Sequence, residues 1–393
     1  MQNHIHNRNH TSNPFSPQHP VQPVCFADRK NELRDFKNIV LATAMLDPPA
    51  PLNYAILGTW GQGKTSLLYK FRQIALEELK EVKCVCIYFP LTPQDCKNWE
   101  VFTDSFLRNV KSTANATGGI LPKISENIGK WELSLNLGPI SAQRRSAQEP
   151  PKMLDALQTL WEKHLKPSEV DIAFVLLDDL HYFPLRAEES AYLTLRATFQ
   201  ELVNRGCNYS LIVTAPSLLF SEIADTAEPV VRFFKRFDLK PFTFEDAKEA
   251  IRVRLKVAKS RTTVDDEVID VLTSKTQGHP YLIMFAMFEL LNLVNRSHRI
   301  NVGELAKHWP VIEASFDQSI FEQKYQTASE KERELMIKIA ELKQDFVSPS
   351  DLKELGSTAE LFSRLEKKEL LIRHGRGKYI LFHPMFVEFL KKQ

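Results

Sequence analysis

The chain has 393 residues, 43% of them apolar and 25% charged, which is the composition of an ordinary globular protein long enough for two or three domains. Its formal net charge of +2 excludes a global basic signature for nucleic-acid binding and leaves only local patches for such contacts. No apolar run reaches the roughly 20 residues of a membrane span, no signal peptide opens the chain, and five cysteines without a C-x-x-C pair favour a reducing cytoplasm.

Residues 1–24 are rich in His, Asn and Pro and show almost no apolar periodicity, which predicts a disordered tail. The four histidines in this tail fit no compact metal site. From Phe26 onward the composition becomes that of a folded domain.

Short apolar strands then alternate with amphipathic helices as far as residue 241, which predicts an α/β core with a parallel sheet covered on both faces. An insertion with a short edge strand is expected at 111–150. The predicted strands are 53–57, 83–89, 172–178 and 210–215, and the predicted helices are 65–80, 98–110, 152–165 and 190–205.

The first strand is followed by Gly58, Thr59, Trp60, Gly61, Gln62, Gly63, Lys64, Thr65 and Ser66. This run fits the P-loop pattern G-x-x-x-x-G-K-[ST] without a mismatch, and a strand precedes it and a helix follows it, as the motif requires. Glycines allow a tight loop whose N–H groups close on phosphate oxygens, and the new helix adds its dipole. Lys64 can reach the β- and γ-phosphates and Thr65 can bind Mg²⁺, so we predict an ATP or ADP site.

A second half of this site is expected where the apolar run 172–177 ends in Asp178 and Asp179. Parallel sheets bind ligands at the carboxyl ends of their strands. We expect Asp178 to hold Mg²⁺ through water or Thr65, and Asp179 to polarise the attacking water. The alternative is an aspartate pair that only caps the next loop.

Three further residues are weaker candidates. Thr214 ends the strand 210–215, where it would contact the γ-phosphate or the water, or serve a structural purpose only. Arg232 or Arg236 would stabilise transition-state charge in a neighbouring subunit, and the alternative is a solvated basic turn.

After Pro241 the strand patterns stop, and helical patterns at 243–258, 264–275, 280–296 and 302–325 predict an all-α domain over 242–326. Residues 327–393 read as three helices, 330–342, 350–355 and 358–370, followed by a hairpin at 371–381 with glycines at its turn. Three helices and a hairpin predict a winged helix.

This order of motifs resembles the AAA+/STAND-type P-loop ATPases over residues 25–393: an NTPase core at 25–241, a helical lid and a winged helix. The run 26–33 resembles the F-x-G-R-x-x-E-L box that these ATPases place beside the adenine, with Asp28 in place of the usual Gly. The resemblance implies that Arg29 belongs to the nucleotide site. Residues 230–255 resemble the passage from the core into the lid.

The motifs leave two subfamilies of these ATPases as candidates for the resemblance. Origin-recognition and helicase-loader ATPases share the layout but usually carry Asp-Glu in the second motif and an arginine in the lid helix, whereas residues 281–294 contain no Arg. Gly278-His279-Pro280 resembles instead the G-x-P motif of STAND and archaeal ATPases, which implies that Pro280 packs near the base. His383 lies where STAND switches place a histidine facing the ADP phosphate, with a satisfied core histidine as the alternative.

The resemblance implies an ATP-hydrolysing switch, in which nucleotide bound between core and lid gates the winged helix and the binding of a protein partner on another chain. A trans-acting arginine would require a homo-oligomer. One alternative is a DNA-binding initiator that uses Arg373, Arg376 and Lys378, although 14 basic and 12 acidic residues over 319–393 argue against a strong electrostatic footprint. Another is a nucleotide-locked scaffold with little turnover.

Overall fold

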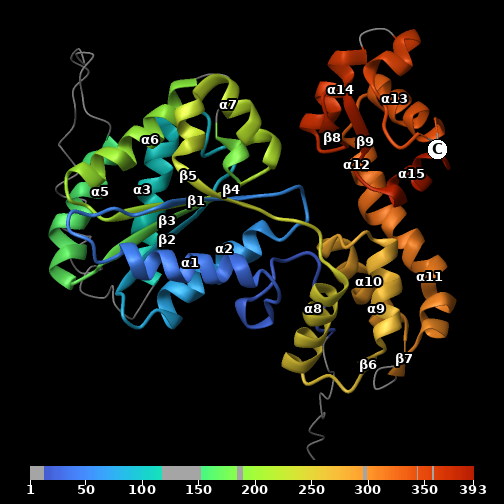
Figure 1. Cartoon of the computed structure of the whole chain (residues 1–393), viewed down its shortest axis with the longest axis horizontal. Helices are drawn as coiled ribbons and strands as arrows, with labels where there is room; N and C mark the ends of the chain where they lie inside the picture. Colours follow the sequence, from blue (N-terminus) through green and yellow to red (C-terminus); the bar gives the residue numbers. More distant parts are fainter. Residues whose placement is uncertain (1–12, 117–151, 184–188, 295–298, 343, 356–357) are drawn as a thin grey trace, which may run out of the picture. The chain divides into compact units, whose positions relative to one another are not determined.

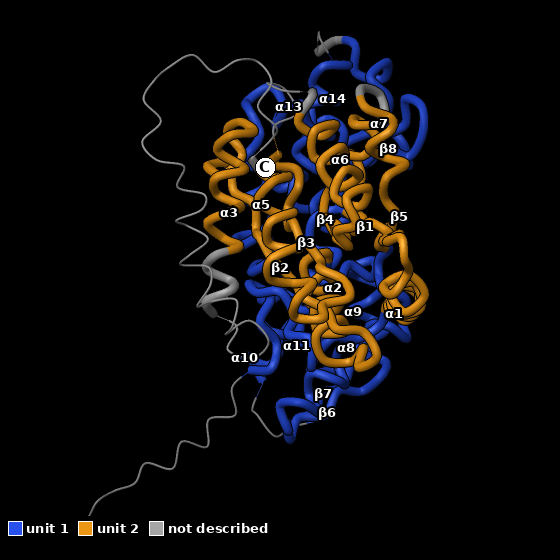
Figure 2. Tube along the Cα trace, turned by 90° about the vertical axis from the view of Figure 1, so that its left-hand side faces the viewer, with its two compact units in different colours: residues 1–28, 59–63, 240–393 blue, residues 29–58, 64–239 orange. Residues whose placement is uncertain are grey.

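The computed structural model describes residues 13–116, 152–183, 189–294, 299–342, 344–355 and 358–393. It consists of two compact units, which we describe separately: the first (unit 2 in Figure 2) contains residues 29–58 and 64–239, and the second (unit 1 in Figure 2) contains residues 1–28, 59–63 and 240–393. The edge strand and polar loop expected within 111–150 lie outside the described residues.

The first unit is built on a parallel five-stranded sheet with the strand order β2-β3-β4-β1-β5 (Figure 1). Four of these strands lie where the sequence predicts them, and the fifth, at one edge, was not predicted. The strands are β1 (Asn53–Leu57), β2 (Cys84–Pro90), β3 (Ile172–Asp178), β4 (Tyr209–Ala215) and β5 (Phe234–Asp238). β1, β3 and β4 are buried along their whole length, as strands covered on both faces must be.

Helices cover both faces of this sheet (Figure 1). On one face, Phe36 stacks on Phe71 with ring centroids 4.2 Å apart and also contacts Tyr54 of β1. α1 (Lys30–Thr43) and α2 (Lys64–Gln73) supply those two phenylalanines. The opposite face is covered by α3 (Trp99–Ala116), α5 (Lys152–Leu160), α6 (Glu189–Asn204) and α7 (Ser217–Arg232). The α/β fold expected from the sequence is therefore confirmed.

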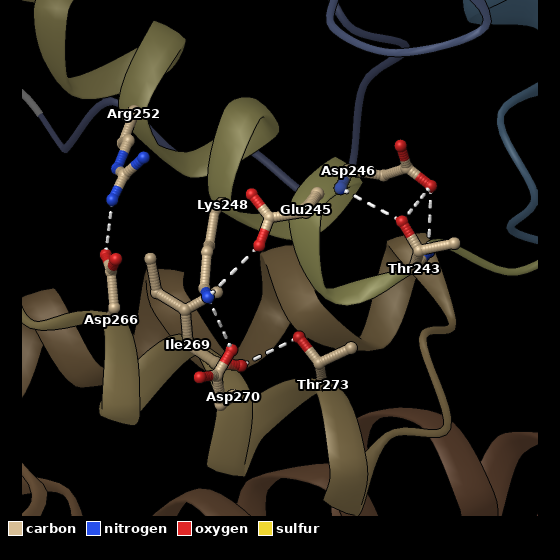
Figure 3. A network of polar contacts seen from close by, with 9 residues as sticks. All are labelled: Thr243, Glu245, Asp246, Lys248, Arg252, Asp266, Ile269, Asp270 and Thr273. Carbon is tan, nitrogen blue, oxygen red and sulfur yellow. Dashed lines mark hydrogen bonds and ion pairs between the residues drawn. The ribbon is translucent and has the colours of Figure 1, made fainter.

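The second unit is mainly helical. Its lid portion contains α8 (Phe244–Val257), α9 (Asp266–Lys275), α10 (Pro280–Leu293), α11 (Val302–Phe316), α12 (Glu322–Gln326) and a parallel pair of short strands, β6 (Thr263–Val264) and β7 (Arg299–Ile300). A capping box of Thr243 and Asp246 begins α8, and Lys248 then joins Glu245 to Asp270 of α9 (Figure 3).

The chain ends with α13 (Glu330–Glu341), a 3-10 segment (Pro349–Leu355), α14 (Thr358–Lys367), β8 (Leu371–Gly375), β9 (Lys378–Leu381) and α15 (Pro384–Leu390). β8 and β9 are antiparallel, and Val347 exchanges backbone hydrogen bonds with Tyr379 of β9. Phe321 contacts Phe382, Phe386 and Phe389, so this segment and the lid share one apolar core. The helices and the hairpin occur in the predicted order, and their assignment as a winged helix stays a prediction.

The described residues 13–24 differ from the disordered tail expected over residues 1–24, of which residues 1–12 lie outside the described part of the chain. Phe15 is 1% exposed and lies under the guanidinium group of Arg254. The Asn13 side-chain amide donates to the carbonyl of Phe288 within α10. A single buried aromatic outside any long helix or strand produces no periodicity, which is why the sequence did not indicate this packing. Among the described residues, no helix combines the length and the apolar character that crossing a bilayer demands.

Candidate functional site

The P-loop connects β1 to α2. The Gly58 N–H donates to the carbonyl of Ala215 at the end of β4 (3.3 Å), which fixes the start of the loop. At its other end Lys64 folds back, and its Nζ donates to the carbonyl of Gly58 (2.9 Å). Gly61 and Gly63 adopt φ values of +76° and +88°, a region that favours glycine. The loop is therefore closed on itself, with the Lys64 ammonium group held over its backbone.

Asp178 lies at the end of β3 and is 3% exposed. Its Oδ1 accepts hydrogen bonds from the hydroxyls of Thr65 (3.2 Å) and Thr214 (2.5 Å), and its Oδ2 accepts one from the Tyr88 hydroxyl (3.1 Å). Burial raises the pKa of Asp178, and the hydrogen bond from Thr214 acts in the opposite direction. The carboxylate is thus buried among hydroxyl groups.

This donor set fits Mg²⁺. Magnesium prefers oxygen ligands and is usually held by one or two carboxylates together with substrate phosphates. Thr65 and Asp178 supply such oxygens beside the start of α2. In the described part of the chain no cluster of three or more His, Cys, Asp or Glu forms a protein-only metal site. A metal here would therefore depend on phosphate oxygens as well as on these two residues.

Asp179 occupies a different environment from its neighbour. Its backbone is left-handed (φ 62°), and its N–H donates to the Thr214 hydroxyl (2.8 Å). Its side chain is 44% exposed, and its Oδ1 lies 3.8 Å from Nδ1 of His181. Partial burial raises the pKa of Asp179, whereas the charge of Lys64 lowers it. Two adjacent carboxylates in such different settings can divide metal binding and water activation between them.

Thr214 connects the two aspartates. It is fully buried, donates a hydrogen bond to the Asp178 carboxylate and accepts one from the backbone N–H of Asp179. In this arrangement its hydroxyl positions both aspartates. The direct contact with the γ-phosphate or the water expected from the sequence stays a prediction.

The middle of the P-loop, residues 59–63, belongs to the second unit, where it packs against the start of α10. The Trp60 carbonyl accepts a hydrogen bond from Nε2 of His279 (3.0 Å), and the Gly61 carbonyl accepts one from the N–H of Tyr281 (3.3 Å). Burial lowers the pKa of His279 to about 3, so its ring is neutral at physiological pH. A Cβ on Gly61 would lie 2.5 Å from Cε1 of His279, so this approach requires glycine. Pro280 begins α10 directly after the histidine, and its contact with a nucleotide base stays a prediction.

The indole of Trp60 extends this contact. The centroid of its ring lies 4.4 Å from the centroid of the Tyr281 ring. Nζ of Lys324 lies 4.6 Å from the centroid of the Trp60 ring. The same ammonium lies 4.9 Å from the ring of Phe382, which follows β9. One lysine therefore bridges the P-loop tryptophan and the C-terminal segment through two cation–π contacts.

His383 is 3% exposed, and both of its ring nitrogens are engaged. Nδ1 accepts the N–H of Met385 (3.1 Å), which caps α15, and Nε2 donates to the carbonyl of Thr276 (2.9 Å). Its ring centroid lies 6.2 Å from that of His279. These contacts are those of a core histidine, and a sensing role for His383 stays a prediction.

The candidate arginines lie on other elements. Arg29 is 8% exposed and precedes α1, and Asp28 beside it adopts φ +67°, the conformation that the usual glycine would favour. The side chain of Arg232, at the end of α7, is 77% exposed and pairs with Glu228. Arg236 pairs with Asp238 within β5 rather than in the turn expected as the alternative. Among the described residues, neither Arg232 nor Arg236 is in contact with the Asp178–Asp179 pair.

Three residues of this region were not singled out from the sequence: Tyr88, Tyr281 and Lys324. Tyr88 lies near the end of β2 opposite Leu176, two residues before Asp178. A tyrosine near the carboxyl end of a strand that neighbours the Asp178 strand is a usable signal, provided that the strand order is known. Tyr281 contacts the loop through its backbone N–H and its ring, and Lys324 lies on a separate helix, so neither is marked by a motif.

No protein-family model and no curated protein matches the chain. Solved structures do. The Walker-type ATPase of Pyrococcus abyssi aligns with a TM-score of 0.62 at 15% identity, over 96% of this chain and 99% of that one. The Aeropyrum pernix ORC2 protein, solved with ADPNP and ADP, aligns with a TM-score of 0.60 at 15% identity, over 96% of both chains.

The chain has the P-loop NTPase fold of these proteins. Cdc6p of Pyrobaculum aerophilum agrees, with a TM-score of 0.50 at 12% identity over 96% of this chain and 97% of that one. Identities this low establish the fold alone and do not establish an activity.

Proposed function

We propose that this chain is a Mg²⁺-dependent ATPase that works as a conformational switch. The observation that carries the proposal is the hydrogen-bonded cluster of Thr65, Asp178, Asp179 and Thr214 beside the start of α2. A nucleotide is the ligand that such a cluster and a P-loop serve together. The ADPNP and ADP complexes of the similar Aeropyrum pernix protein support this choice of ligand.

The chemistry follows from the geometry. The phosphates would lie against the N–H groups at the start of α2, with the Lys64 ammonium group exchanging the Gly58 carbonyl for phosphate oxygens. Thr65 and Asp178 would hold Mg²⁺, which neutralises charge on the β- and γ-phosphates. Asp179 would orient a water molecule whose oxygen bonds to the γ-phosphorus as the bond to the ADP oxygen breaks. The water's proton passes to Asp179 or phosphate, and ADP and inorganic phosphate leave.

The switch rests on contacts within the second unit. The carbonyls of Trp60 and Gly61 are bound by His279 and Tyr281, and Lys324 links Trp60 to Phe382. A nucleotide that changes the backbone of the loop therefore changes what the lid and the C-terminal segment contact. The γ-phosphate would favour one arrangement and hydrolysis would release it. A protein partner on another chain, and a homo-oligomer with Arg232 or Arg236 acting in trans, belong to the same proposal.

Lys324→Ala tests this link. In the wild type, ATP with Mg²⁺ should change amide hydrogen exchange in residues 371–390. The variant should lose roughly half of that change or more, because both cation–π contacts are removed, while its nucleotide affinity stays within about twofold. Hydrogen-exchange mass spectrometry and calorimetry measure the two quantities.

Lys275→Ala is the matched control, since Lys275 lies 4.4 Å over the ring of Trp309, away from the loop. It should keep the full nucleotide response. An undiminished response in Lys324→Ala would show that the lysine does not transmit the state of the loop.

DNA binding is a second candidate function because the side chains of Arg373, His374, Arg376 and Lys378 are exposed on one hairpin. If this hairpin binds phosphates, replacing Arg373, Arg376 and Lys378 with alanine should weaken duplex binding and reduce its salt slope by about one for each phosphate that is no longer neutralised. Fluorescence anisotropy at two salt concentrations, with and without ATP, measures this. Arg364→Ala on α14, where the arginine pairs with Glu360, is the control. Equal binding by the triple variant would exclude the hairpin as the DNA surface.

A third candidate is a scaffold that retains its bound nucleotide and, unlike the ATPase switch, hydrolyses scarcely any ATP. Mass spectrometry of nucleotide carried through purification, together with an ATPase assay, distinguishes it. Tightly bound ADP without turnover would favour the scaffold over the switch.

A further inference from the structure

Two tyrosines connect α2 to the buried carboxylate of β3. The Tyr88 hydroxyl donates to Oδ2 of Asp178 (3.1 Å), and the Tyr69 hydroxyl lies 3.2 Å from that of Tyr88. Their rings meet edge to face with centroids 5.4 Å apart. Tyr69 lies four residues after Thr65, on the same face of α2. The helix therefore reaches Asp178 twice, directly through Thr65 and indirectly through the two tyrosines.

The direction of this chain of hydrogen bonds follows from its chemistry. An ionised carboxylate only accepts, so the single proton of Tyr88 is committed to Asp178. The Tyr88 oxygen must then accept from Tyr69, whose hydroxyl is the donor of that pair.

The two carboxylate oxygens of Asp178 have different hydrogen-bond donors. Oδ1 accepts hydrogen bonds from the hydroxyls of Thr65 and Thr214. Among the described residues, the hydrogen-bond donor to Oδ2 is the Tyr88 hydroxyl. When the Thr65 oxygen turns to a cation, its 3.2 Å bond to Asp178 is the one that must change. Tyr88 and Thr214 would then hold opposite oxygens and fix the plane of the carboxylate. Partners of this kind typically change metal affinity about 10- to 100-fold when removed.

We propose that Tyr88, supported by Tyr69, is a positioning residue for Mg²⁺ in this site, because its hydroxyl holds the Asp178 carboxylate in the orientation that the ion requires. This inference rests on the proposed Mg²⁺-dependent nucleotide site and adds residues to it. The alternative is that Tyr88 only satisfies a buried polar group, in which case its loss would affect stability and not the response to the metal.

Tyr88→Phe in the full chain separates these two roles, because it removes the hydroxyl and keeps the ring with its edge-to-face contact to the Tyr69 ring. Binding of ADPNP is measured by calorimetry in EDTA and at increasing Mg²⁺ concentrations. We expect the half-saturating Mg²⁺ concentration to rise about tenfold or more. Affinity in EDTA should stay within about twofold of the wild type, because Lys64 and the P-loop are unchanged. Tyr69→Phe should shift the Mg²⁺ response in the same direction but less.

Tyr209→Phe is the matched control. Tyr209 is buried in β4 of the same sheet, and its hydroxyl donates to the carbonyl of Leu157 instead of to Asp178. The half-saturating Mg²⁺ concentration of Tyr209→Phe should equal that of the wild type. An unchanged Mg²⁺ response in Tyr88→Phe, or an equal loss of affinity in EDTA and in Mg²⁺, would overturn the positioning role. A wild-type chain that binds no ADPNP, or binds it without any Mg²⁺ dependence, would instead refute the proposed function.

Discussion

Lys64→Ala should abolish ATP binding at concentrations that saturate the wild type. Lys64 begins α2, and its ammonium group is already held over the P-loop by the Gly58 carbonyl. Removing a charge-assisted hydrogen bond to phosphate from a partly enclosed site costs about 3 kcal/mol, which corresponds to a roughly 100-fold weaker affinity. Calorimetric titration with ADPNP and Mg²⁺ measures this change.

Lys70→Ala provides the control for that measurement. Lys70 lies on the same helix, but its ammonium group contacts Gln73 and Glu78, toward the other end of α2. The variant should bind ADPNP within about twofold of the wild type, since it keeps every group of the P-loop. Wild-type affinity in Lys64→Ala would remove the assignment of the P-loop as the nucleotide site.

The parts of the fold that could be predicted are those whose signal is local. The buried strands 53–57 and 172–178 contain the continuous apolar runs 54–57 and 172–177, and their context identifies them. β5 reads Phe-Lys-Arg-Phe-Asp, and its charges suggested a turn. As an edge strand paired only with β1, it can expose Lys235 and Arg236 to solvent, which a central strand cannot do. Its neighbours decide its conformation, and a single sequence does not show them.

The candidate site likewise contains residues marked by local motifs and residues that only the fold brings together. Lys64, Thr65, Asp178 and Asp179 were predicted because each lies in a motif of adjacent residues. Tyr88 lies 90 residues from Asp178 and meets it only through the register of β2 on β3. His279 was noted for its resemblance to a family motif, but its hydrogen bond to Trp60, 219 residues away, depends on tertiary packing. The residues that support a site are therefore harder to predict than those that carry its chemistry.

Asp179→Asn should keep nucleotide binding and lose hydrolysis. Its carboxylate is 44% exposed and takes no part in the hydrogen bonds that hold Asp178 and Thr65 together. Asparagine has the same size and tolerates the left-handed backbone of this position (φ 62°), so the substitution removes the charge without adding strain. Without a group to orient the water and accept its proton, turnover should fall roughly 100-fold or more. Phosphate-release kinetics and ADPNP calorimetry measure the two properties separately.

Asp171→Asn is the matched substitution, because Asp171 directly precedes β3 and lies at the opposite end of the same strand. Its Oδ2 accepts the backbone N–H of Lys83, a bond that an asparagine oxygen can also accept. This variant should retain both binding and turnover. If Asp179→Asn turned over ATP as fast as Asp171→Asn does, the attacking water would have to be activated elsewhere, and Asp179 would be a capping residue for the turn that follows β3. If it lost binding as well, its charge would be holding the loop and not the water.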